Sequence, residues 1–220
     1  MIGLVFDIDG VVADTESVNA AVSVEVFRDL CGIKVKAEDF RPFLGTGDTR
    51  YMTGVAERYG VEIDPERATA LRQEKFLAVL ARDGMAPYPG VIDLMTAARD
   101  ADDVGLAIAT SGNKAKQFPV LEAIRADRGW FDVVITGDDV TRKKPDPQIY
   151  LLTAERLGLA PGRCVVIEDA PAGVAAAKGA GMACIAVTNT VDARALAGAD
   201  RIVRTLDEIA LADVRALAHS

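Results

Sequence analysis

The sequence is poor in the residues that support histidine, zinc or disulfide chemistry. It has one histidine, His219, next to the end of the chain, and three cysteines that form no C-x-x-C pair. Because chain ends usually fray, a catalytic histidine is not expected. The wide spacing of Cys31, Cys164 and Cys184 favours neither a disulfide framework nor a zinc site, so we expect buried free thiols.

Aromatic residues and long apolar runs are also scarce. Aromatic residues make up 5% of the chain although half of its residues are hydrophobic, so aliphatic side chains have to fill the core. This composition favours packed helices and parallel strands. No segment approaches the run of about eighteen apolar residues that a membrane helix needs, and the chain opens directly on a strand pattern. We therefore expect a soluble, cytoplasmic α/β protein.

Positive charge is in deficit, and no basic stripe is present. The formal net charge is −8, which gives a field that repels nucleic acid and anionic lipid. We expect no nucleic-acid or membrane partner, and a monomer whose partner is a small-molecule substrate. An acidic protein acting on an anionic substrate must gather its few cations at the site, which draws attention to Lys144.

Alternating apolar patterns predict a parallel sheet with helical crossovers. The predicted strands are Ile2–Phe6, Val104–Ala109, Val133–Thr136, Cys164–Ile167, Ala183–Val187 and Arg201–Val203. Between them the helical spacing predicts helices at Val91–Arg99, Lys114–Arg125, Pro147–Leu157 and Pro171–Gly179. The fold class is therefore α/β with a Rossmann-like parallel sheet.

The connection between the first two strands is much longer than a βα connection needs. It carries four helical patterns, at Glu16–Leu30, Ala37–Leu44, Thr49–Tyr59 and Pro65–Arg82, and no strand signal. We predict a core made of residues 1–13 and 88–220 and an inserted helical cap of residues 14–87.

Two carboxylates stand where the first strand ends. Asp7 and Asp9 follow the apolar run and precede Gly10, at the sheet edge where open α/β proteins bind ligands. Spacing by one residue would point both side chains the same way along an extended backbone, and crowded carboxylates need a cation, a shared proton or a chemical role. The alternative is an Asx turn in which Asp9 caps the bend at Gly10.

Other strand ends add hydroxyls, a lysine and a second acidic pair. Thr110, Ser111 and Asn113 follow the second strand at a helix N-terminus, where they could bind an anion or simply cap the helix. Lys144 lies in a stretch stiffened by Pro145 and Pro147, although a solvated lysine is the usual alternative. Glu168 and Asp169 end the fourth strand, with helix capping as the alternative for Asp169. Gathered on one edge of one sheet, these groups point to a catalytic site.

In this order, Asp7-x-Asp9-Gly10, Thr110, Lys144-Pro145 and Glu168-Asp169 resemble the haloacid dehalogenase superfamily over essentially the whole chain. Further motifs, including Tyr88-Pro89-Gly90, look like the branch of β-phosphoglucomutase and sugar-phosphate phosphatases. The resemblance implies Mg²⁺ held by the Asp7 and Asp169 carboxylates and the Asp9 carbonyl, with Glu168 nearby.

The same resemblance implies roles for the remaining groups. Asp7 is expected to attack phosphorus and form an aspartyl-phosphate, while Asp9 acts as general acid and then general base. Thr110, Ser111 and Lys144 are expected to bind the transferring phosphate. The expected function is a magnesium-dependent phosphatase acting on a small sugar or polyol phosphate.

The cap is expected to select the leaving group. Candidate substrate contacts are Gly45, Asp48, Thr49 and Lys75 in the cap and Asn113 in the core. In sugar phosphomutases of this branch the cap loop supplies an arginine that grips a second phosphate, whereas Asp48 stands at that position here. This difference favours the phosphatase over the alternative, a phosphomutase of the β-phosphoglucomutase type.

Overall fold

The computed structural model describes residues 1–43 and 47–218, and only the backbone of Asp48. It divides into two compact units. The first, called the sheet unit below, comprises Met1–Asp14 and Met85–Ser220, and the second, the helical unit, comprises Thr15–Gly84. The boundaries between the two units lie after residues 14 and 84, whereas the sequence predicted boundaries after residues 13 and 87.

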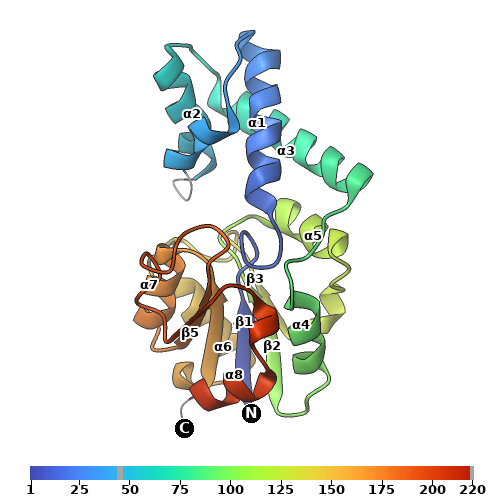
Figure 1. Ribbon diagram of the computed structural model, residues 1–220, viewed down its shortest axis with the longest axis vertical. Coiled ribbons are helices and arrows are strands. Elements are labelled where there is room, and N and C mark those ends of the chain that lie inside the picture. Colours follow the sequence, from blue (N-terminus) through green and yellow to red (C-terminus); the bar gives the residue numbers. More distant parts are fainter. Residues whose placement is uncertain (44–46, 219–220) are drawn as a thin grey trace. The chain divides into compact units, whose positions relative to one another are not determined.

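The described part of the sheet unit contains a six-stranded sheet in the order β3-β2-β1-β4-β5-β6 (Figure 1), and every pair of neighbours is parallel. The strands are β1 (Ile2–Phe6), β2 (Val104–Ala109), β3 (Val133–Ile135), β4 (Cys164–Glu168), β5 (Ala183–Val187) and β6 (Arg201–Val203). All residues of β1, β2, β4 and β5 are buried, as expected for parallel strands covered on both faces. The predicted α/β class with a Rossmann-like parallel sheet is confirmed.

Helices alternate with these strands. They are α4 (Val91–Arg99), α5 (Lys114–Ala123), α6 (Gln148–Leu157), α7 (Pro171–Gly179) and α8 (Leu211–Leu217). Helix α6 contacts α7, and α4 contacts α8, while α6 and α4 both pack on β2. Helix α5 ends two residues earlier than predicted, since Arg125 adopts a positive φ of 62° that ends the helical turn.

The register of the central strands sets where their ends meet. Phe6 on β1 is paired with Ile108 on β2 and with Ile167 on β4. The next residue, Asp7, donates its backbone N–H to the Ile167 carbonyl. The residues that follow Phe6 and Ile167, which are Asp7 and Glu168, therefore lie at the same edge of the sheet.

The helical unit is formed by α1 (Thr15–Cys31), the 3₁₀ helix η1 (Ala37–Phe43), α2 (Asp48–Tyr59) and α3 (Pro65–Asp83). Its core includes Phe27, Phe40 and Tyr51. The ring centroids of Phe27 and Phe40 are 5.8 Å apart, and those of Phe40 and Tyr51 are 5.0 Å apart. The short helix predicted at Ala37–Leu44 is a 3₁₀ helix over Ala37–Phe43, and Pro42 within it lacks the N–H that an α-helix needs.

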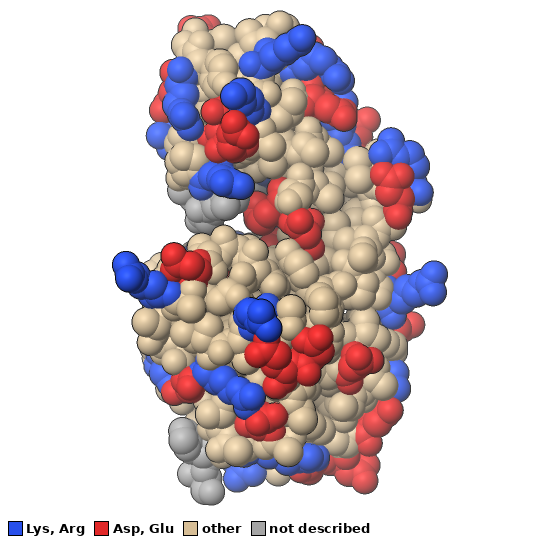
Figure 2. Space-filling view, viewed as in Figure 1, with Lys and Arg blue, Asp and Glu red and all other residues tan. Residues whose placement is uncertain are grey.

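Among the described residues, no helix has both the length and the apolar character to cross a bilayer. On the face drawn in Figure 2, acidic and basic side chains are interspersed. All three cysteines are free, and Cys164 and Cys184 are buried.

Candidate active site

A cluster of charged side chains lies where β1 and β4 end. Oxygen atoms of Asp7, Glu168 and Asp169 lie within 4.8 Å of one another, and all three residues are buried. The Lys144 Nζ donates to Asp7 Oδ1 and to Glu168 Oε1, each at 2.7 Å, and to the Ala109 carbonyl at 3.3 Å. Asp7 and Lys144, which are 137 positions apart in the sequence, thus meet in one site.

Glu168 is held by donors on both of its oxygens. Besides Lys144, the Tyr150 hydroxyl donates to Oε1 at 2.6 Å. The backbone N–H groups of Asp169 and Ala170 donate to Oε2 at 3.0 and 3.3 Å. Burial, followed by the charge of Glu168, raises the pKa of Tyr150, so the phenol keeps its proton and remains a donor. Glu168 therefore serves to hold Lys144 in place.

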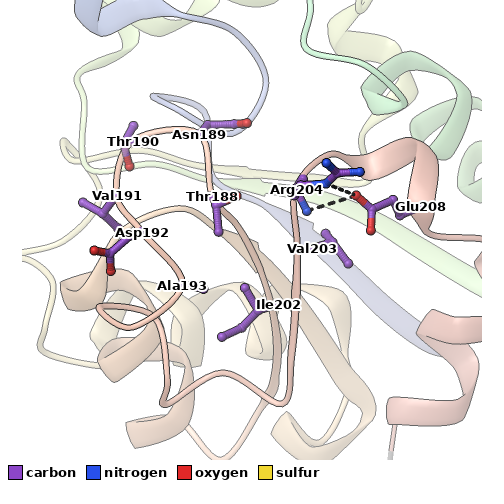
Figure 3. Close-up of a pocket in the computed structure, with 10 residues that line it drawn as sticks. All are labelled: Thr188, Asn189, Thr190, Val191, Asp192, Ala193, Ile202, Val203, Arg204 and Glu208. Carbon is purple, nitrogen blue, oxygen red and sulfur yellow. Dashed lines mark hydrogen bonds and ion pairs between the residues drawn. The ribbon is translucent and has the colours of Figure 1, made fainter.

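Asp169 is oriented by the loop that follows β5 (Figure 3). The Thr190 hydroxyl donates to Asp169 Oδ2 at 2.6 Å, and the Asn189 amide donates to the Gly10 carbonyl at 2.8 Å. Gly10 has a φ of 77°, and a Cβ there would lie 2.0 Å from Asp169 Oδ2. Only glycine allows this approach of the first motif to the fourth strand.

The electrostatics of the cluster fit a divalent cation. Burial raises the pKa of Asp7 to about 7, and the Glu168 charge adds to this while Lys144 opposes it. Burial and the charges of Glu168 and Asp7 also hold the pKa of Asp169 well above its usual value. Burial disfavours the charge on Lys144, but Asp7 and Glu168 outweigh it and raise the pKa of its ammonium.

Three carboxylates and one ammonium leave an excess of negative charge that a divalent cation would neutralise. Carboxylate oxygens are the ligands that Mg²⁺ prefers, so the donor set suits this ion. Because both oxygens of Glu168 are already held by protein donors, Asp7 and Asp169 are the carboxylates best placed to bind it.

The Asp9 carboxylate is held by different residues from those that hold Asp7. Lys116 Nζ donates to Asp9 Oδ1 at 2.9 Å, and Gln117 Nε2 donates to Asp9 Oδ2 at 2.6 Å. Both donors come from the first turn of α5. The backbone nitrogens of Val11 and Val12 bond the Ile8 carbonyl, which makes the turn around Asp9 compact.

The phosphate-binding candidates lie at the end of β2. Thr110 is fully buried, and its backbone N–H donates to the Ile135 carbonyl. Ser111 follows it and is exposed. Asn113 is the N-cap of α5, because its side chain accepts from the Lys116 N–H at 2.9 Å. Capping, which was the alternative for this residue, is thus what the structure shows.

Of the candidates in the helical unit, the structure describes Thr49 and Lys75 in full. Gly45 lies outside the described residues, as do the side chain of Asp48 and the whole of His219. Thr49 is exposed in the first turn of α2. Lys75 on α3 pairs with Glu25 at 3.1 Å and with Asp29 at 2.9 Å, so its ammonium is neutralised within the helical unit.

Sequence reasoning missed five residues of this site. They are Lys116, Gln117, Tyr150, Asn189 and Thr190. For Lys116 and Gln117 a signal existed, since they stand three and four residues after the Asn113 cap and therefore on the same first turn. Nothing local in the sequence distinguishes Tyr150 or Thr190.

A cavity of about 650 Å³ lies beside the site (Figure 3). The loop after β5 and strand β6 line it, with Thr190 and Asp192 on one side and Arg204 and Glu208 on the other. Thr190 is the link between this cavity and the cluster, because its hydroxyl bonds Asp169.

Comparison with known proteins identifies the family. The family model of haloacid dehalogenase-like hydrolases matches residues 3–181. The chain belongs to this family. The predicted superfamily is confirmed, and the chain is a hydrolase in the branch that contains phosphatases and β-phosphoglucomutase-like proteins.

Individual relatives cover nearly the whole chain. The fructose-1-phosphate phosphatase YqaB of Escherichia coli is 32% identical over 82% of this chain and 93% of its own length. The crystal structure of CbbY from Rhodobacter sphaeroides with xylulose-(1,5)-bisphosphate has a TM-score of 0.83 and 31% identity, and covers 94% of this chain and 96% of that one. These similarities support the predicted enzyme class, a phosphoric monoester hydrolase.

A longer relative also contains this fold. The chloroplastic protein SUPPRESSOR OF QUENCHING 1 of Arabidopsis thaliana is 34% identical over 96% of this chain. The chain spans only a fifth of that protein's length.

Proposed function

We propose that the chain is a magnesium-dependent phosphatase that hydrolyses a small phosphate monoester, a sugar or polyol phosphate, through an aspartyl-phosphate. The observation that carries this proposal is the buried cluster in which Lys144 joins Asp7 to Glu168 and Asp169 completes a set of three carboxylates. A carboxylate beside an ammonium and two further acids is suited to accept phosphorus when a cation is bound.

The proposed metal ligands are the carboxylates of Asp7 and Asp169 and the backbone carbonyl of Asp9. The phosphate dianion and a carboxylate 4 Å apart repel each other by about 4 kcal/mol per charge pair at an effective dielectric constant of 20. The ion, when bound, supplies the positive charge that offsets this repulsion. Lys144 offsets it from the other side, because its Nζ contacts the Asp7 carboxylate.

The reaction has two steps, carried out by residues of the sheet unit. In the first, an Asp7 oxygen forms a bond to phosphorus as the ester P–O bond breaks, and Asp9 gives a proton to the departing oxygen. In the second, a water oxygen attacks phosphorus while Asp9 takes its proton, and the Asp7–phosphorus bond breaks. Thr110, the Ser111 N–H and Lys144 bind the equatorial oxygens in both steps.

Two relatives support the proposed substrate class. One is named for its action on fructose 1-phosphate and the other holds a ketopentose bisphosphate, and both are small sugar phosphates. The helical unit is inserted between β1 and β2, and we assign to it the selection of the leaving group. Thr49, Lys75 and the loop with Gly45 and Asp48 remain the candidate contacts there.

The test is turnover of a panel of sugar and polyol phosphates with Mg²⁺. Steady release of inorganic phosphate is expected, with a loss of at least about 10³-fold in Asp7→Asn because the nucleophile is removed. Asp102→Asn, an exposed aspartate on the turn before β2, is the matched control and should keep its activity. Isomerised sugar phosphate without phosphate release would favour the mutase, and near-normal turnover by Asp7→Asn would refute the proposal.

A further inference from the structure

Gln117 is a buried polar residue whose role is not explained by the fold alone. It lies in the first turn of α5, its exposed fraction is 0%, and its Nε2 donates to Asp9 Oδ2 at 2.6 Å. Lys116, beside it, donates to the other oxygen of the same carboxylate. Both oxygens of Asp9 are thus bound by adjacent residues of one helical turn, across 107 and 108 positions of sequence.

Keeping an amide at this position has a cost. The Gln117 Oε1 is buried and has no hydrogen-bond partner among the described residues. An unsatisfied buried acceptor costs about 1–3 kcal/mol, whereas an apolar side chain of similar length would avoid this cost. Exchanging the amide oxygen and nitrogen gives no relief, since the oxygen would then face the Asp9 carboxylate. The favourable contact that the amide gains is the one with Asp9.

The backbone around Gln117 is shaped to admit its side chain. A Cβ on Gly112 would lie 2.0 Å from the Gln117 Nε2, closer than atoms can approach. Gly112 belongs to the turn after β2 that also carries Thr110. The glycine therefore makes room for the amide between the phosphate-binding turn and Asp9.

We propose that Gln117, assisted by Lys116, is the positioning residue that fixes the Asp9 carboxylate for proton transfer to the leaving group. This inference rests on the proposed function. Asp9 lies in the loop after β1, where its side chain would otherwise rotate, and a misplacement of about 1 Å can cost about a hundredfold in rate. Two donors on two different oxygens fix both the position and the plane of the carboxylate. Lys116 is the secondary partner, because its longer side chain is 17% exposed.

The test compares two aryl phosphates of nearly equal size but different leaving group. Phenyl phosphate needs its leaving oxygen protonated, whereas 4-nitrophenyl phosphate departs readily without a proton. Gln117→Met is expected to lower kcat for phenyl phosphate about tenfold more than for 4-nitrophenyl phosphate, with KM little changed, since general acid catalysis contributes about 10²–10⁴-fold. Asp9→Asn should show the same selectivity in stronger form.

Three further variants separate positioning from stability. Gly112→Ala displaces Gln117 without replacing it, so it should shift the leaving-group selectivity in the same direction even if Gln117→Met folds poorly. Lys116→Met should show part of the leaving-group selectivity of Gln117→Met, whereas Lys116→Arg should behave like the unmodified protein. Lys114→Met is the matched control, because Lys114 lies in the same turn but pairs with Asp139 at 2.8 Å.

The outcomes distinguish this inference from the function on which it rests. Equal losses on both substrates in Gln117→Met and Gly112→Ala, or no loss in either variant, would overturn the positioning role. If Asp9→Asn shows the increased dependence on the leaving group while the Gln117 and Gly112 variants behave like the unmodified protein, only the present inference falls. If the unmodified protein with Mg²⁺ hydrolyses no phosphate monoester, the proposed function itself falls.

Discussion

The pKa values of two buried or partly buried aspartates, Asp169 and Asp200, are shifted in opposite directions because their neighbouring charges and hydrogen-bond donors differ. At Asp169, burial and two neighbouring carboxylates raise the pKa. At Asp200, burial also acts to raise the pKa, but hydrogen-bond donors outweigh it and the pKa is lowered. Lys178 donates to both oxygens of Asp200, and the Cys184 N–H donates to one of them at 2.7 Å. Asp200 is thus paired with the Lys178 ammonium, whereas Asp169 is a proposed ligand of a metal ion.

This contrast predicts a pH-dependent contribution to stability from Asp200. Its folded-state pKa is below the unfolded value of about 3.9, so its contribution is complete well above that pH and is lost as the pH falls through the folded pKa. Asp200→Asn should lower the free energy of unfolding by about 1 kcal/mol at pH 7, discounted for partial exposure. Urea titrations from pH 7 to pH 3 should show this difference shrinking.

The control for this experiment is Asp102→Asn, which changes an exposed aspartate of the same unit. Because this side chain is exposed, the substitution should change the free energy of unfolding at pH 7 by no more than about 0.5 kcal/mol. A loss in Asp200→Asn that is equally large at pH 7 and pH 3 would contradict the assignment.

At the scale of elements, α7 is fitted to the site through its first turn. It begins at Pro171, which needs no N–H partner there, directly after Glu168 and Asp169. A Cβ on Gly173 would lie 1.8 Å from the Glu168 Oε1, so this residue gives the carboxylate its space. At the other end of the helix, a Cβ on Gly179 would meet Pro147 at an ordinary 3.6 Å.

The two glycines of α7 therefore predict opposite results for the same change. Gly173→Ala should destabilise the protein by about 1–3 kcal/mol through overpacking and should lower kcat, because Glu168 and with it Lys144 must move. Gly179→Ala should be neutral or stabilising by up to about 1 kcal/mol, since alanine favours a helix. Urea unfolding and phosphatase kinetics on both variants test this, and similar losses in the two would show that the helix as a whole, not the approach to Glu168, is sensitive.

At the scale of the whole molecule, the charged cluster predicts that binding of a metal ion stabilises the fold. The residues that would hold the ion, Asp7 and Asp169, directly follow β1 and β4 and are more than 150 positions apart in the sequence. An ion that binds the native state and not the unfolded chain stabilises the protein according to its concentration. The sheet unit should therefore be more stable when Mg²⁺ is present.

We therefore predict that Mg²⁺ raises Tm, and this measurement is independent of catalytic activity. At Mg²⁺ concentrations about 100 times the Kd, stabilisation of about 2.7 kcal/mol is expected, and EDTA should abolish both it and the turnover. Asp169→Asn should lose the rise in Tm, while Asp200→Asn should keep it because Asp200 lies outside the cluster. An equal Mg²⁺ effect on Asp169→Asn and the unmodified protein would argue against these ligands.

The sequence by itself determined the succession of strands and helices along the chain and which residues stand at the strand ends. These features are local: an apolar run predicts a buried strand, and a glycine or proline marks its end. Asp7, Glu168 and Asp169 could be named because each follows such a run, and Lys144 because it precedes Pro145 and Pro147. At Ala37–Leu44 the sequence predicted a short helix without its type, and the structure shows a 3₁₀ helix that contains Pro42.

Only the tertiary structure decided which groups share a hydrogen bond. The order β3-β2-β1-β4-β5-β6 places β1 between strands that follow it by about 100 and 160 residues, and this order sets the distances within the cluster. The donors to Asp9, Glu168 and Asp169 come from α5, α6 and the loop after β5. Their side chains meet because the helices pack at one register on the sheet, and no spacing along the chain encodes that register.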